Sequence, residues 1–222
     1  MRRAAPGREI ETKLRVADVP ALRRLLKRLR ARVIVPRTHE SNTLYDTAGK
    51  ALIRRGELIR IRIEQPAGRG AKRRPTRDSK AILTFKGPVR KSPISKTTGR
   101  GSKTRPYFKV REEIEISLDD GGKMAEILRA LGLRPGFRYE KFRTTYALPG
   151  IRNLKVELDE TPVGSFLELE GHTAAIDRAA RLLGYGRSEY ITQTYGALYI
   201  ADCRRRGMSP ANMLFPPTKK MR

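Results

Sequence analysis

Charged residues alternate with uncharged ones near the start of this chain, in a pattern that could place chemistry on one face of a strand. Side chains one residue apart in a strand point to opposite faces of the sheet, so Glu9, Glu11 and Lys13 share one face. The same alternation recurs at 60–62, 84–86, 111–115, 141–143, 157–159 and 168–170. A single strand of this kind is typical of a sheet whose charged face meets water, but the repetition favours a shared charged interior.

These faces carry both signs of charge, and each sign suits a different ligand. Arginine offers bidentate hydrogen bonds to phosphate oxygens and lysine a compact charge, whereas clustered carboxylates suit Mg²⁺ or Mn²⁺. The cationic set is Lys13, Arg60, Arg62, Lys86, Arg111, Lys141 and Arg143. The anionic set is Glu9, Glu11, Glu113, Glu115, Glu157, Asp159, Glu168 and Glu170. Carboxylates alone would repel a polyphosphate, so the two sets together predict a polyphosphate site that depends on a divalent metal.

The elements that must position these residues follow from hydrophobic periodicity and turn signals. Strands are predicted at 9–16, 32–45, 58–64, 80–86, 108–118, 137–148, 153–158 and 165–170. Helices are predicted after Asp18, near 48–52, and over 121–131, 173–183 and 190–206. An eight-stranded antiparallel sheet can close into a barrel with room for a ligand. We therefore expect an α+β fold, in which a closed eight-stranded antiparallel β-barrel has helices packed outside and charges inside.

The formal net charge of +26 is concentrated in segments that flank or interrupt the predicted strands. We expect one domain over 9–203, a basic head at 1–8, basic loop insertions at about 66–79 and 88–106, and a basic flexible tail at 204–222. Such charge binds polyanions without sequence specificity, which allows non-specific RNA or polyphosphate contact. Few aromatic residues are interleaved with it for base stacking, so a non-catalytic polyphosphate or RNA binder is only a further alternative.

Other features bear on where the protein is found and with what it associates. Cys203 is the only cysteine, which excludes an intrachain disulfide and is consistent with a reducing compartment. No signal sequence or apolar run of membrane-spanning length is evident, so the protein is expected to be cytoplasmic. We expect a monomer or a homodimer. Tyr190, Tyr195 and Tyr199 fall near helical spacing and are predicted to pack against the barrel wall.

The ordered motifs resemble those of the CYTH superfamily, the triphosphate tunnel metalloenzymes. This superfamily includes class IV adenylate cyclases, thiamine triphosphatases and inorganic triphosphatases. Glu9, Glu11 and Lys13 match its signature E-x-E-x-K. The later strands match in order through Arg60 and Arg62, Lys86, Arg111 with Glu113 and Glu115, Lys141 and Arg143, Glu157 and Asp159, and Glu168 and Glu170. The ordered set covers residues 9 to about 200 and is far more specific than any one motif.

The resemblance implies a tunnel with one or two divalent metals and a bound triphosphate. It implies metal ligation by Glu9, Glu11, Glu168 and Glu170, with Asp159 next. It implies phosphate binding by Lys13, Arg60, Arg62, Lys86, Lys141 and Arg143, to which the charge pattern adds Arg111. Glu113 would bind a second metal or orient water, and Lys13, Glu113 and Lys86 are the expected catalytic residues.

Two reactions are compatible with such a tunnel, and they differ in the attacking oxygen. Attack by water would hydrolyse inorganic triphosphate, thiamine triphosphate or a nucleoside triphosphate. Attack by the ribose hydroxyl of ATP would produce cyclic AMP and pyrophosphate. The sequence shows no diagnostic base or adenine pocket. Hydrolysis is favoured because it demands less of the site, and class IV adenylate cyclase is the alternative.

Overall fold

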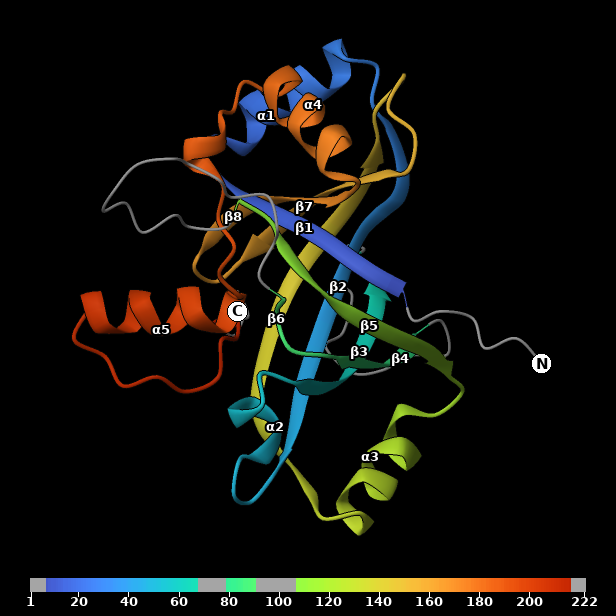
Figure 1. The fold of residues 1–222 in the computed structure, drawn as a ribbon, viewed down its shortest axis with the longest axis vertical. Coiled ribbons are helices and arrows are strands. Elements are labelled where there is room, and N and C mark those ends of the chain that lie inside the picture. The colour runs from blue at the N-terminus through green and yellow to red at the C-terminus, as the bar shows by residue number, and fades with distance from the viewer. Residues whose placement is uncertain (1–6, 68–78, 91–106, 217–222) are drawn as a thin grey trace, which may run out of the picture.

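Eight antiparallel strands close into a barrel in the computed structural model, which describes residues 7–67, 79–90 and 107–216 (Figure 1). The order around the barrel is β1-β5-β4-β3-β2-β6-β7-β8. The strands are β1 (Gly7–Val16), β2 (Arg32–Thr47), β3 (Leu58–Pro66), β4 (Lys80–Lys86), β5 (Lys109–Leu118), β6 (Leu133–Ala147), β7 (Leu154–Thr161) and β8 (Gly164–Gly171). The predicted closed eight-stranded antiparallel barrel is confirmed.

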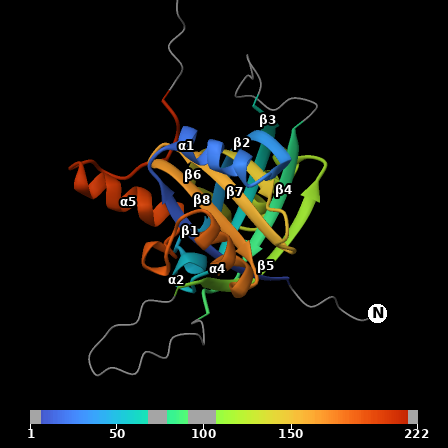
Figure 2. The same ribbon diagram turned by 90° about the horizontal axis from the view of Figure 1, so that it is seen from above.

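The helices lie outside this barrel. They are α1 (Val19–Arg28), α2 (Ala51–Arg54), α3 (Gly121–Ala130), α4 (Thr173–Leu182), α5 (Tyr195–Arg205) and the short 3₁₀ helix η1 (Arg187–Glu189). Figure 1 shows α1 and α4 together at one end of the molecule and α3 at the other. Figure 2 shows α5 at the side of the barrel. None of the helices in the described ranges is long and apolar enough to cross a membrane.

The apolar faces of the strands point outward, against the helices. Leu14 of β1, Leu158 of β7 and Leu167 of β8 are completely buried in a cluster that also contains Leu22 of α1 and Ile176 of α4. A second cluster joins Ile61 of β3 to Leu128 of α3. Because strand side chains alternate, the opposite faces of these strands point into the barrel. The helices thus bury the apolar faces and leave the charged faces to line the interior.

Leu158 of β7 is 0% exposed and belongs to the larger hydrophobic cluster. Leu158→Ala is expected to lower the free energy of unfolding by about 2–5 kcal/mol, through lost burial and the cavity left behind. The matched control is Leu131→Ala, because Leu131 is 71% exposed and its loss should change stability by less than about 0.5 kcal/mol. Urea unfolding measures both variants. Equal effects of the two substitutions would contradict the packing described here.

The last helix begins later than the sequence predicts. The predicted helix over 190–206 starts only at Tyr195, where the Thr194 side chain caps it by accepting a hydrogen bond from the Ala197 amide. Residue Ile191 instead pairs with Lys13 of β1, through N···O distances of 2.9 and 2.8 Å. The pairing of β1 with β5 ends at Lys109, so Ile191 satisfies backbone groups of β1 beyond that point. Tertiary pairing therefore overrides the local helical spacing.

The segment after α5 also differs from the expected flexible tail. Met213 is completely buried, and its amide and carbonyl pair with Arg138 and Glu140 of β6 at 2.9 Å each. Strand β7 pairs only with the later half of β6, so the earlier half has an open edge that Met213 occupies. Residues 217–222, the head at 1–6, and most of the predicted insertions at 66–79 and 88–106 lie outside the described residues.

Candidate functional site

The interior of the barrel gathers the charged residues that the strand pattern singled out. The predicted site residues that are buried there are Glu9, Glu11, Lys13, Arg60, Lys86, Arg111, Lys141, Asp159 and Glu168. Those that are partly exposed are Arg62, Glu113, Arg143 and Glu170. Burying such charges is tolerable only when opposite charges pair or ligands complete the site. Each of these residues makes an ion pair with another described residue.

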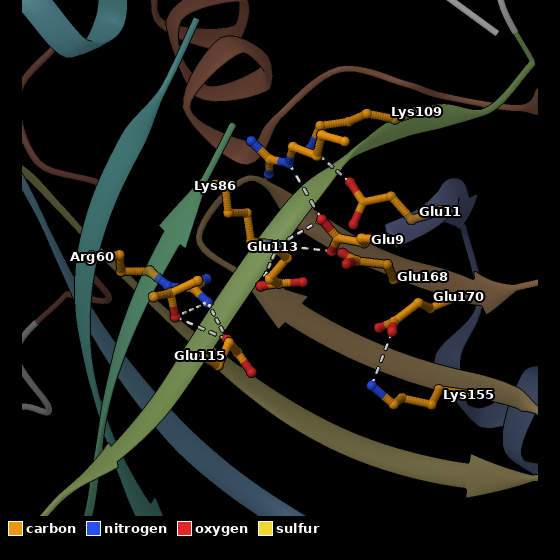
Figure 3. Close-up of polar contacts among 12 residues, drawn as sticks. Glu9, Glu11, Arg60, Lys86, Lys109, Glu113, Glu115, Lys155, Glu168 and Glu170 are labelled. Atoms are coloured by element: carbon orange, nitrogen blue, oxygen red, sulfur yellow. Dashed lines mark hydrogen bonds and ion pairs between the residues drawn. The ribbon is translucent and has the colours of Figure 1, made fainter. Parts of the chain in front are cut away.

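Glu9, Glu11 and Glu168 form a carboxylate group that could hold one metal ion. One oxygen of each lies within 4.8 Å of the others, and all three residues are buried (Figure 3). Strand β1 places Glu9 and Glu11 on one face, and the pairing of Lys13 with Glu168 sets the third carboxylate beside them. Buried carboxylate oxygens are the ligands that Mg²⁺ and Mn²⁺ prefer, so the donor set fits such an ion.

Two other predicted metal ligands have different partners. Glu170 accepts a hydrogen bond from Lys155 at 2.9 Å. Asp159 accepts hydrogen bonds from Arg143 at 2.6 Å, from Lys141 at 3.1 Å and from the Tyr195 hydroxyl at 2.6 Å. The structure brings neither into the Glu9, Glu11 and Glu168 group, and their role as ligands stays a prediction.

Cations lie against the candidate metal ligands. The Nζ atoms of Lys13 and Lys109 lie 2.9 and 2.7 Å from the same oxygen of Glu11. Burial by itself raises the pKa of Glu11, but the charges of Lys13 and Lys109 outweigh burial and hold that pKa well below its usual range. Lys86 and Arg111 contact Glu9 at 2.7 and 3.3 Å. Glu11 is therefore ionised, as a carboxylate that binds a metal ion must be.

Lys109 is a functional candidate that sequence reasoning missed. It is buried and reaches Glu11 from β5, within the strand predicted at 108–118. Burial lowers the pKa of Lys109 to about 8, against the opposing effect of Glu11. The available signal was spacing, because Lys109 lies two residues before Arg111 and so shares its face.

Glu40 is a second residue that the sequence did not single out. It lies in β2 on the same face as Asn42, and it is buried among Arg62, Lys141 and Arg143. The sequence predicts a strand at 32–45, but no charged face was assigned to that strand. The alternation of Glu40 and Asn42 within that segment was the signal that could have found it.

The cationic side of the interior is organised around Arg143. Its guanidinium makes two hydrogen bonds of 2.6 Å to Asp159, approaches Glu168 at 3.4 Å and forms a close ion pair with Glu157. Arg60 donates to Thr84 at 3.0 Å, while its Nε is buried and has no hydrogen-bond partner among the described residues. A bidentate cation and an unused donor facing a buried interior suit the oxygens of a phosphate chain.

Lys86 links the candidate metal-binding group to a carboxylate with an altered pKa. Its Nζ lies 2.7 Å from Glu9 and 2.8 Å from Glu113. Burial raises the pKa of Glu113 to about 7, although Lys86 opposes the shift. A carboxyl group that titrates near neutral pH can accept or donate a proton during a reaction. This is consistent with the catalytic role predicted for Glu113, which stays a prediction.

Tyr195 lies inside the site, whereas the sequence predicted that it packs against the barrel wall. Its ring contacts Phe166 edge to face at 5.6 Å, and the Nζ of Lys13 lies 5.2 Å from the ring centroid. The hydroxyl donates to Asp159, as described above. Pairing of Ile191 with β1 delays the start of α5, and Tyr195 at its first turn then reaches the interior.

A pH prediction follows from Glu157. Burial raises its pKa to about 7, assisted by Glu168 and Asp159 and opposed by Arg143. A raised carboxyl pKa contributes stability below the unfolded value of 4.5, and this is lost as pH rises through about 7. Glu157→Gln should therefore reduce the loss of stability between about pH 5 and about pH 8, by about 2–3 kcal/mol. Urea unfolding in EDTA measures it, and parallel pH curves for both proteins would contradict the assignment.

Comparisons with known proteins agree with this architecture. The chain is 26% identical over 176 residues to a candidate adenylate cyclase from Methanocaldococcus jannaschii, a match covering 79% of this chain and 83% of that protein. A solved candidate adenylate cyclase from Vibrio parahaemolyticus shares the fold at 16% identity and a TM-score of 0.65, over 87% of this chain and 98% of that one. A solved candidate adenylyl cyclase from Hippeastrum is described as having a dominant triphosphatase activity. It shares the fold at 18% identity and a TM-score of 0.53, over 91% of this chain and 97% of that one.

The CYTH domain profile matches residues 7–195. That span contains all eight strands of the barrel and ends at Tyr195, the first residue of α5. It therefore includes the candidate metal ligands, the interior cations and the tyrosine that reaches Asp159. The chain belongs to the CYTH domain family, whose members are metal-dependent enzymes that act on triphosphates.

Proposed function

We propose that this protein hydrolyses a triphosphate with the help of Mg²⁺ or Mn²⁺. The substrate class comprises inorganic triphosphate, thiamine triphosphate and nucleoside triphosphates. The observation that carries the proposal is the buried carboxylate group of Glu9, Glu11 and Glu168 within the same barrel as Arg60, Lys141 and other phosphate-suited cations.

The roles of the residues follow from what phosphoryl transfer requires. The reaction depends on neutralising phosphate charge and on placing the attacking oxygen in line, with little covalent chemistry. A divalent metal held by Glu9, Glu11 and Glu168 would supply Lewis-acid polarisation of phosphate oxygens. Lys13 and Lys86 would hold phosphate oxygens when those carboxylates take up the metal. Glu113 would accept the proton of the attacking water, for which its pKa of about 7 is suitable.

A class IV adenylate cyclase is the second candidate. It is favoured by the relative from Methanocaldococcus jannaschii, which is named as a candidate adenylate cyclase and is 26% identical to this chain. The Hippeastrum protein supports hydrolysis instead, because a candidate adenylyl cyclase with this fold shows a dominant triphosphatase activity. Hydrolysis also requires only water as the nucleophile, whereas cyclisation requires a bound ribose in one orientation. We therefore place hydrolysis first.

The test is a substrate panel with the purified protein. Inorganic triphosphate, thiamine triphosphate and ATP are each incubated with Mg²⁺, with Mn²⁺ or with EDTA, and products are identified by phosphorus NMR. Release of orthophosphate supports hydrolysis, and cyclic AMP with pyrophosphate supports the cyclase. Lys86→Met, prepared in parallel, controls for contaminating phosphatases because its activity should be lost. No turnover of any substrate with either metal would overturn the enzymatic proposal.

The basic segments outside the described residues make a separate RNA-binding role testable. Deleting 68–78, 91–106 and 217–222 leaves the barrel and the packed segment around Met213 intact. If these segments supply non-specific RNA contact, the deletion should abolish salt-sensitive RNA binding and retain triphosphatase activity. Loss of both properties would contradict this division.

The cytoplasmic location and the monomeric or homodimeric state also stay predictions.

A further inference from the structure

Glu40 occupies an unusual position for an acidic residue, because it lies among cations predicted to hold phosphates. Its Oε2 is 3.4 Å from Arg62 Nε and 3.3 Å from Lys141 Nζ, and its Oε1 is 3.7 Å from Arg143 Nε. The side chain is only 3% exposed. The carboxylate of Glu40 thus lies close to the position that an anion bound to these three cations would occupy.

The cations direct their hydrogen bonds to other partners. Arg143 donates to Asp159, Lys141 donates to Asp159, and Arg62 Nε donates to the side-chain oxygen of Asn42 at 3.3 Å. Glu40 Oε2 is buried and accepts no hydrogen bond from the described residues. A buried polar atom in that state calls for an explanation beyond stability. Charge attraction holds Glu40 in place, while its hydrogen-bonding capacity is unused.

Glu40 is negative and is not part of the candidate metal site. Burial raises its pKa, but Arg62, Lys141 and Arg143 outweigh burial and hold that pKa far below its usual range. In the described part of the chain, the acidic group that could share one ion is Glu9, Glu11 and Glu168. A metal bound there would leave the charge of Glu40 in place, so any phosphate on the three cations meets a nearby carboxylate.

Building on the proposed function, we propose that Glu40 is a specificity-determining residue that weakens the binding of bare anions to the tunnel. Its carboxylate offsets the attraction of Arg62, Lys141 and Arg143 for phosphate. Affinity that is equal for substrate and product slows product release and does not speed the chemical step. Glu40 would therefore favour ligands that also engage the metal, and it would hasten departure of an anionic product such as pyrophosphate or phosphate.

The experiment compares Glu40→Gln with the wild-type protein by isothermal titration of pyrophosphate in EDTA. Glutamine keeps the shape of the side chain and removes the charge, so pyrophosphate should bind about 10–100-fold tighter. The matched control is Glu64→Gln, because Glu64 also pairs with Arg62, at 3.2 Å, but its side chain is 22% exposed. Solvent screens that charge, so the control should change affinity by less than about threefold.

A second variant tests the same idea with the opposite sign. Asn42→Asp adds a negative charge beside Arg62 and should weaken pyrophosphate binding by about tenfold or more. This arm remains informative if Glu40→Gln does not fold, which thermal melting reports. A folded Glu40→Gln that binds pyrophosphate no tighter than wild type overturns the inference, as does unchanged affinity in Asn42→Asp.

Parallel measurements separate this inference from the proposed function. Wild-type protein is assayed for triphosphate hydrolysis with Mg²⁺ in the same preparation. If the wild-type protein hydrolyses a triphosphate but Glu40→Gln does not bind pyrophosphate more tightly, only the role of Glu40 is contradicted. Absence of both hydrolysis and triphosphate binding in every variant would contradict the proposed function and the inference together. A lower KM with a lower kcat in Glu40→Gln would support slow product release.

Discussion

Glu11→Gln is expected to abolish metal-dependent activity and to weaken Mn²⁺ binding more than any other change at the site. Glu11 supplies one of three carboxylates in the candidate metal site, and it alone pairs with both Lys13 and Lys109. Loss of a major charge-stabilising group slows phosphoryl transfer by about 10³-fold or more. Mn²⁺ affinity, measured by electron paramagnetic resonance without substrate, should fall by at least about 100-fold.

The control for this prediction is a carboxylate outside the barrel interior. Glu160 pairs with Arg37 at 2.7 Å and its side chain is partly exposed, so Glu160→Gln should leave Mn²⁺ binding near the wild-type value. Because the spectroscopic measurement uses no substrate, it reports on the metal site even if the substrate is misidentified. Wild-type Mn²⁺ affinity in a folded Glu11→Gln protein would show that the metal lies elsewhere.

Arg143→Met is expected to produce the largest loss of stability among single substitutions in the interior. Arg143 lies within ion-pair distance of Asp159, Glu157, Glu168 and Glu40. These carboxylates also raise the pKa of Arg143 well above its usual range despite burial, so it stays charged. Removing one partner of a buried pair leaves an uncompensated charge, which costs about 3–5 kcal/mol. Urea unfolding in EDTA gives the value directly.

An exposed ion pair provides the comparison. Arg55 pairs with Glu57 at 2.8 Å, but the arginine side chain is 57% exposed, so Arg55→Met should lower the free energy of unfolding far less than Arg143→Met does. Added Mn²⁺ should restore part of the stability lost in Arg143→Met if the ion gathers the freed carboxylates. A cost for Arg143→Met similar to that for Arg55→Met would mean that the interior carboxylates do not depend on this arginine.

Much of the barrel could be predicted because strand periodicity is a local property. The pattern around Glu9, Glu11 and Lys13 assigns each side chain to a face without knowledge of any partner strand. Repetition of this pattern with charges of both signs then favoured a shared charged interior. The packing of Leu158 and Leu167 outward, against the helices, confirms that the apolar strand faces point out and the charged faces point in. The position of Arg143 inside the barrel follows from the same alternation.

Features that depend on contacts between distant segments could not be predicted. The helical spacing of Tyr190, Tyr195 and Tyr199 suggested a continuous helix, but pairing of Ile191 with Lys13 delays its start. Tyr195 consequently reaches Asp159 and not the outer wall. The burial of Met213 within the expected flexible tail could not be predicted for a similar reason. The open edge of β6 that Met213 occupies arises only once the barrel is closed.

The amino-acid sequence by itself determined that the charged faces of most strands would share one interior, and that both signs of charge would meet there. Only the tertiary structure decided which charges pair, because partners such as Lys109 and Glu11 are set by strand register around the barrel. That register separates the candidate metal-binding group of Glu9, Glu11 and Glu168 from Glu40, which lies among the cations. Alternation is encoded within each strand, whereas register depends on closure of the whole sheet.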